Sequence, residues 1–214
     1  MLGLLAPTLI ALIAALAVGG SPRGLFRNGL RGWPAIVAAF AVELTLYNPP
    51  INAQAWALWV GPWLWVVTRL VILGVLVANG WGTTARLTWP WRVAALGVGL
   101  NTLVICANGG HMPQSVDAAI AVWGSNHIDT TRLQNVTPMD SQTQLGWLAD
   151  TFAEPSWMPR PNVVSLGDVL LALGIASWTF AGSKTTGVPA PAKIVPRIAT
   201  PVDGDEGGER GGSA

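Results

Sequence analysis

Two ionisable side chains, Glu43 and Arg69, each lie inside a long apolar run. A charge in hydrocarbon costs several kcal/mol and normally finds a partner or water, so such residues are candidates either for an ion path or for a structural pair. Each lies about 11 residues, or roughly 16 Å of helix, from the same end of its run, counted from Gly32 and from Gly80. Because the two depths match, the sequence predicts an ion pair between Glu43 and Arg69 if the two runs are neighbouring helices.

Three further carboxylates, Asp150, Glu154 and Asp168, could together supply a general acid or base. Asp168 has a simpler explanation, because it follows Ser165 in the first turn of an apolar run. A serine at that position caps a helix, and an acid in the first turn favours the positive end of the helix dipole. No serine has a recognisable histidine partner, and the G-x-S-x-G pattern is absent. We therefore expect structural or binding roles for these residues and no catalytic residue among them, and the sequence favours a protein that is not an enzyme.

A metal site is the other chemistry that the side chains suggest. His111 and His127 are the two histidines, and with Asp117 and Asp129 they offer the imidazole and carboxylate groups that zinc or iron accepts. The H-x-x-x-H and H-x-x-E spacings, which place ligands on one helical face, are both absent. We expect surface or hydrogen-bonding roles for these side chains, and the sequence indicates no metal and no particular cofactor.

Long apolar runs are the elements that must position these residues. Charged residues make up 11% of the 214 residues, whereas a soluble domain carries about 25%. A helix that crosses a membrane needs about 20 mostly apolar residues. The runs that approach this length are 2–19, 31–47, 55–79, 91–108 and 164–182. The sequence predicts an all-α integral membrane bundle of about five transmembrane helices with a small extracytoplasmic cap.

Basic residues predict the orientation of the chain. The loop 20–32 has three of them, the loop 80–92 has two and the segment after 182 has four, which makes nine on one side. Arg132 and Arg160 are the two on the other side. Since basic residues concentrate in cytoplasmic loops, we expect the N-terminus outside and the C-terminus in the cytoplasm.

The chain divides into four segments. Residues 1–108 hold the first four transmembrane helices, 109–163 form the extracytoplasmic cap, 164–182 form the fifth helix and 183–214 form a cytoplasmic tail. The cap suggests short helices at 115–123 and 141–150. The tail is rich in proline, glycine and charge, and we expect it to be disordered because it has little apolar surface to bury.

The fourth apolar run ends abruptly, in Asn108, Gly109, Gly110, His111, Met112 and Pro113. A glycine just past a helix can adopt the left-handed conformation that closes its end, and a proline soon afterwards keeps the helix from resuming. One glycine suffices for a cap. We expect the second to turn His111 and Met112 back over the bundle beside Asp168, so that this junction anchors the cap and forms the floor of any binding site.

Three groups of residues resemble a known family. Asn79, Gly97 and Asn101 lead into the pattern Asn-Gly-Gly-x-Met-Pro; Leu145-Gly146-x-Leu148-x-Asp150 follows; and Ser165-x-Gly167-Asp168 opens the last run. In these, over most of residues 1–182, the chain resembles a bacterial membrane family known as domain of unknown function 5317. Ala149 and Gln114 depart from its pattern. The resemblance implies a multi-pass protein of the bacterial cytoplasmic membrane, and it implies no activity.

Two functions are consistent with the sequence. The leading hypothesis is a non-catalytic membrane protein whose cap binds a partner protein or a small ligand, as an accessory subunit of a larger membrane complex. The twelve tryptophans support it, because aromatic residues anchor interfaces and membrane surfaces. The alternative is a small transporter or intramembrane enzyme that uses Glu43, Arg69, Asn101 and Asp168, and it requires these four to meet at one cavity. The expected partners are the lipid bilayer and a membrane protein, and not nucleic acid, because no basic stripe is present.

Overall fold

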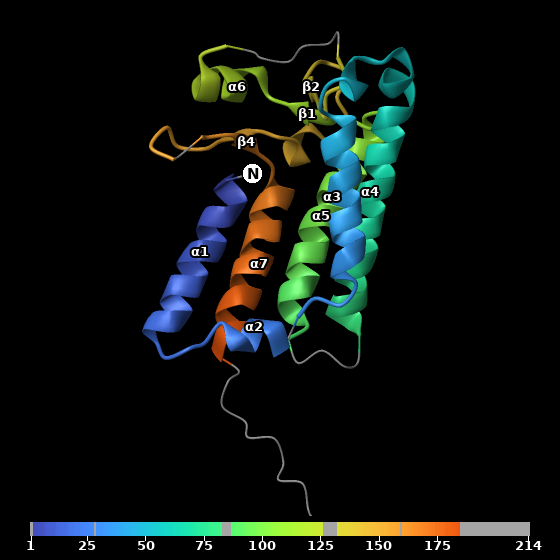
Figure 1. Ribbon diagram of the computed structural model, residues 1–214. Coiled ribbons are helices and arrows are strands. Elements are labelled where there is room, and N and C mark those ends of the chain that lie inside the picture. The colour runs from blue at the N-terminus through green and yellow to red at the C-terminus, as the bar shows by residue number, and fades with distance from the viewer. Residues whose placement is uncertain (1, 28, 83–86, 126–131, 159, 185–214) are drawn as a thin grey trace, which may run out of the picture.

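The computed structural model describes residues 2–27, 29–82, 87–125, 132–158 and 160–184. Each of the predicted apolar runs forms a helix whose bounds differ from the expected ones by no more than two residues. These helices are α1 (Leu2–Ala17), α3 (Trp33–Leu46), α4 (Ala55–Trp81), α5 (Trp89–Ala107) and α7 (Leu166–Lys184). They run side by side, and a cap lies across one end of the bundle (Figure 1).

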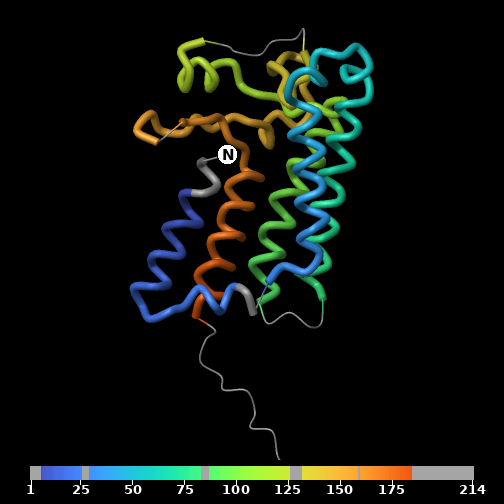
Figure 2. The backbone as a smooth tube through the Cα atoms, viewed as in Figure 1, coloured from blue at the N-terminus to red at the C-terminus, as the bar shows by residue number. Residues whose placement is uncertain are grey.

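The helices are not packed in chain order. The last helix, α7, packs between α1 and α5; α5 also packs on α4, and α4 packs on α3. The backbone trace shows the resulting row, with α1 at one edge and α3 and α4 at the other (Figure 2). Three of the helices, α4, α5 and α7, are long and apolar enough to cross a membrane. The other two are apolar but shorter, with 16 residues in α1 and 14 in α3.

Exposed tryptophans mark two levels along the bundle. Near the cap they are Trp56, Trp59 and Trp63, and at the opposite end they are Trp33, Trp81 and Trp89. From Trp59 to Trp81 is 22 residues of α4, or about 33 Å of helix. This is close to the ~30 Å thickness of a bilayer's hydrocarbon core. Many leucine, isoleucine and valine side chains are exposed between the two levels, as expected of a surface that faces lipid.

The end of the bundle opposite the cap carries a short helix that the sequence did not indicate, α2 (Arg23–Arg27). Asn79 fixes the chain that follows it, because its side chain accepts from the backbone N–H of Arg31 at 3.0 Å and donates to the carbonyl of the same residue at 2.9 Å. Between this end and the middle of the bundle, α3, α4 and α5 close on a buried apolar cluster that includes Ile72, Leu76 and Val98.

Among its described residues, the cap combines the α-helix α6 (Val116–Trp123) with two small sheets. Strand β1 (Met112–Gln114) pairs in parallel with β2 (Val136–Pro138), and β3 (Phe152–Ala153) pairs antiparallel with β4 (Val163–Val164). Helix α6 lies where a helix was expected; Ser115 caps it by accepting from the N–H of Ala118. The fold is therefore mostly helical, and the all-α prediction is wrong for the cap.

The helix expected at 141–150 is also absent. Asp140 instead closes a turn by accepting from the N–H of Gln142 at 2.8 Å, and Leu145 has a positive φ of 55°. A single 3-10 turn, η2 (Gly146–Leu148), comes next along the chain, and a β-bridge forms at Asp150. Local side-chain hydrogen bonds of this kind compete with helix formation. A further 3-10 turn, η1 (Ile51–Ala53), lies between α3 and α4. The predicted tail lies almost wholly outside the described residues.

Candidate functional site

Glu43 of α3 and Arg69 of α4 form an ion pair. The Arg69 guanidinium donates to Glu43 Oε1 through Nη2 and, at 3.2 Å, through Nε. Thr68 donates to the same oxygen at 2.6 Å. The guanidinium carbon also lies 5.8 Å from the ring centres of Phe40 and Trp65, a distance at which aromatic faces attract a cation. Both charges are therefore compensated inside the apolar bundle.

A second polar network joins α5 to the start of α7. Asn101 donates through Nδ2 to Asp168 Oδ1 and accepts through Oδ1 from the Ser165 hydroxyl, both at 2.9 Å. The N–H of Asp168 donates to Ser165 Oγ at 3.0 Å, and the N–H of Ser165 donates to Asp168 Oδ2 at 3.1 Å. The last two bonds form a reciprocal helix cap, in which an aspartate takes the usual place of glutamate.

Glycines let α5 and α7 approach closely enough for this network to form. A Cβ atom at Gly97 would lie 2.7 Å from the backbone nitrogen of Leu171, and one at Gly167 would lie 2.6 Å from the carbonyl oxygen of Gly97. Lower down, a Cβ at Gly174 would lie 2.6 Å from the nitrogen of Ala94. Small residues at helix contacts of this kind are typical of membrane bundles.

The glycine pair after α5 stops the helix as expected. Gly109 and Gly110 have φ values of 67° and 88°, and the N–H of Gly110 donates to the carbonyl of Ile105 at 2.8 Å, which closes the helix end. Gly110 also rests on α4, where an added Cβ would lie 2.6 Å from Cβ of Pro62. Pro113 lies within β1, and His111 is half-buried just before it.

Asn108 fastens the cap to this helix end. Its side chain donates to the carbonyl of Gln144 and accepts from the N–H of the same residue, both at 2.9 Å. An amide can make this two-way contact with a backbone because it carries both a donor and an acceptor. The N–H of Met112 in turn donates to the carbonyl of Asn135 at 2.8 Å, so both ends of the 112–144 segment lie over α5.

Asp150 is held at the edge of the first sheet. Its N–H donates to the carbonyl of Pro113 at 3.0 Å and its carbonyl accepts from Ser115 at 2.8 Å, beside the bridge to Gln114. The residue is 8% exposed, and its Oδ1 is buried without a hydrogen-bond partner among the described residues. Burial, and then the nearby charge of Asp168, raises the pKa of Asp150 to about 8.

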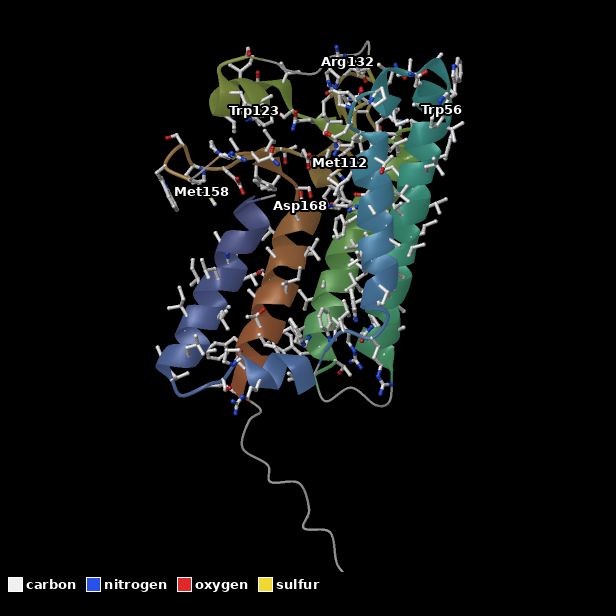
Figure 3. The ribbon with its side chains drawn as sticks, viewed as in Figure 1. Trp56, Met112, Trp123, Arg132, Met158 and Asp168 are labelled. Atoms are coloured by element: carbon white, nitrogen blue, oxygen red, sulfur yellow. The ribbon has the colours of Figure 1, made fainter. Side chains whose placement is uncertain are left out.

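The ion pair, Asn101, Asp168 and Asp150 all line one cavity of about 380 Å³, between the cap and the bundle. Figure 3 shows two of its residues, Met112 and Asp168, at this junction. Its polar and charged lining comes from both sides of the junction and consists of Glu43, Arg69, Asn101, Asn135, Asp150, Glu154, Asn162 and Asp168. Its apolar walls include Phe40, Trp65, Ile105, Met112 and Leu171. The volume lies within the range of small-molecule sites.

The predicted site residues fall into two groups. Six of them line the cavity: Glu43, Arg69, Asn101, Met112, Asp150 and Asp168. The others do not line it and instead shape the backbone around it: Asn108, Gly109, Gly110, His111, Pro113, Ser165 and Gly167. Met112 and Asp168 line the same cavity, whereas His111 does not line it, and the expected position of His111 beside Asp168 stays a prediction.

Several lining residues had no signal in the sequence. Asn135 and Asn162 lie in turn-rich stretches like many others, and Trp65 or Ile105 cannot be told from residues that face lipid. For metals, no group of three or more histidine, cysteine, aspartate or glutamate residues occurs within the described ranges. His127 and Asp129 lie outside those ranges.

The apolar helices and the cavity at their capped end define a mostly helical membrane protein with a candidate binding site. The model of a family of unknown function (DUF5317) matches residues 28–180, and the chain belongs to this family. The match begins before α3 and ends within α7, so it contains every residue that lines the cavity, whereas α1 precedes it. No curated protein and no solved structure matches the chain.

Proposed function

We propose that this protein crosses the bacterial cytoplasmic membrane five times and binds a small molecule in the junction cavity without catalysing a reaction. The two tryptophan levels support five crossings, because α1 and α3 run beside the three longer helices and share their exposed apolar surface. The observation that carries the binding function is the cavity itself, together with the buried carboxylate of Asp150, whose Oδ1 has no hydrogen-bond partner among the described residues.

The basic residues support a cap that lies outside the cell. Arg23, Arg31, Arg92 and Lys184 all lie near helix ends opposite the cap, which is the cytoplasmic side by the positive-inside rule. Single cysteines at Ser125 and Ser213, in a background where the exposed Cys106 is alanine, test this orientation. An impermeant thiol reagent should label position 125 on intact cells and position 213 only after lysis; the opposite result would reject an outer cap.

Transport is the second candidate function, because Glu43, Arg69, Asn101 and Asp168 do converge on one cavity. Two observations favour binding. Toward the end opposite the cap, α3, α4 and α5 close on the apolar cluster around Leu76, which places apolar side chains between the cavity and that end. Each of the four side chains is also already engaged in the ion pair or the capping network, which speaks against an intramembrane enzyme as well.

Attachment to a partner would be compatible with ligand binding. The cap exposes Trp147, Phe152 and Trp157, the last with 80% of its surface accessible. Large aromatic side chains anchor protein interfaces, so these residues support an accessory subunit of a membrane complex. Purification in mild detergent should recover a partner with the wild-type protein and less of it with a Trp147→Ala and Trp157→Ala double variant. Equal recovery would place the contact elsewhere.

Thiol protection tests ligand binding even when the ligand is unidentified. Asn135 lines the cavity and is exposed, whereas Ser125 lies in the cap away from it. In the Cys106→Ala background, a fractionated extract of small molecules from the source cells should slow labelling of Asn135→Cys and leave Ser125→Cys unchanged. If no fraction protects position 135 selectively, the cavity does not hold a cellular ligand.

A further inference from the structure

The charges around the cavity are unbalanced. Among the described residues that line it, four are carboxylates, namely Glu43, Asp150, Glu154 and Asp168, and one, Arg69, is basic. Arg69 is committed to Glu43 through two hydrogen bonds. The other three carboxylates therefore face a partly enclosed space with no further cation in its lining. A low-dielectric site of this composition favours a positive occupant.

Asp150 shows where such an occupant would bind. Its backbone is fixed on both sides by the bonds to Pro113 and Ser115, and the residue is buried. Its Oδ1 is buried and accepts no hydrogen bond from the described residues. A buried carboxylate oxygen normally has a partner, and an acceptor without one calls for a donor from outside the chain.

Asp168 offers a second hydrogen-bond acceptor, and its carboxylate is held in place by two hydrogen bonds. Each of its oxygens accepts one bond, from Asn101 or from the N–H of Ser165, and a carboxylate oxygen can accept a second. Asp150 and Asp168 both line this cavity. The apolar part of the lining includes Phe40, Trp65 and Met112, and such surfaces exclude water from a cation held between them.

We propose that the cavity binds a small organic ammonium ion, whose N–H groups donate to Asp150 and Asp168. Its apolar body packs against Trp65, Ile105 and Met112. This inference rests on the ligand-binding function proposed above and names the class of ligand.

Three probes of similar shape and different charge test it: phenethylamine, 2-phenylethanol and phenylacetate. The full-length protein in lipid nanodiscs is titrated with each at pH 9 by calorimetry, and protection of Asn135→Cys is measured in parallel. We expect saturable binding and protection with the amine, and neither with the alcohol or the acid. Asp150→Asn should lower the affinity for the amine about ten- to hundredfold, the range expected for the loss of a hydrogen bond between charged groups. Asp117→Asn, which changes an exposed acid on α6, should bind as the wild type does.

The wild-type protein supplies a second readout in case the Asp150 variant does not fold. Because the pKa of Asp150 is about 8, a proton competes with the amine at low pH, and affinity should fall about thirtyfold from pH 9 to pH 6.5. The charged groups that share the cavity with Asp150 are Asp168, Glu154 and the Glu43–Arg69 pair. Burial lowers the pKa of His111, which does not line the cavity.

The outcomes separate the two proposals. If the amine does not bind at pH 9, or binds equally well at pH 6.5 and to Asp150→Asn, the ammonium proposal is overturned. If the alcohol or the acid protects position 135 instead, the ammonium proposal fails and the cavity remains a ligand site. If the amine fails and no cellular fraction protects position 135 either, both proposals fail, and the occupant of Asp150 is a proton or water.

Discussion

Replacing Asp150 with asparagine should remove a pH dependence of stability that the wild-type protein shows between pH 6 and pH 8. The carboxyl group is buried, and the negative charge of Asp168 disfavours a second negative charge there. Ionisation of Asp150 therefore costs free energy in the folded protein and little in the unfolded chain. An asparagine side chain of almost the same shape carries no charge at any pH, so its burial cost does not change with pH.

The sign and size of the effect follow from the two pKa values, about 8 in the folded protein and 3.8 without the fold. Between them the folded protein holds a proton that the unfolded chain has released, so the free energy of unfolding falls as pH rises. From pH 6 to pH 8 the unfolded carboxyl stays ionised, whereas the folded one goes from protonated to half ionised. The expected loss in the wild-type protein is about 2 kcal/mol over this interval.

Thermal unfolding in mild detergent at constant ionic strength measures the effect. The wild-type midpoint should fall by a few degrees from pH 6 to pH 8 relative to Asp150→Asn. Asp117→Asn is the matched control, because it makes the same change at an exposed position and should follow the wild type. Parallel profiles for the wild type and Asp150→Asn would refute the assignment of the buried proton to Asp150.

Three further predictions concern the contacts that hold the site. Arg69→Ala should destabilise the protein by about 3–5 kcal/mol in detergent unfolding, and adding Glu43→Ala should restore part of this, because a lone buried charge costs more than none; additive losses would exclude coupling of the pair. Gly110→Ala should lower the thermal midpoint more than Gly109→Ala, because both have positive φ but only Gly110 abuts α4; equal effects would show that backbone strain alone decides. Asn108→Ala should speed proteolysis of the cap and leave the helices intact, as mass spectrometry of the fragments would show; unchanged cleavage would mean that other contacts hold the cap.

The parts of the fold that sequence reasoning found share one property, which is that their cause is local. Apolar runs of sufficient length become helices wherever they stand in the chain. Ser165 caps α7 with the residues that directly follow it, and Gly109 and Gly110 close α5 at its own end. The ion pair between Glu43 and Arg69 could also be predicted from nearly local information. A short connection makes α3 and α4 neighbours, and the equal depth of the two residues then brings their charges together.

The cap could not be predicted in this way because its pairings join distant segments. Strand β1 pairs with a strand more than twenty residues later, and three residues are too few to show an alternating pattern. The bridge between Gln114 and Asp150 joins residues farther apart still. This bridge holds Asp150 at the cavity. The sequence therefore indicated Asp150 as a candidate acid, but it did not indicate that the residue would be buried near Asp168.

The position of α7 between α1 and α5 has a consequence for the order in which the protein is made. About 150 residues separate the end of α1 from the start of its main packing partner. At a synthesis rate of roughly 5–20 residues per second, α7 follows α1 by some 7 to 30 seconds. Asp168 arrives with it, so the ribosome has made nearly the whole described chain before the cavity can close. A nascent chain that stops before residue 165 therefore leaves α1 without that partner and Asn101 without Ser165 and Asp168.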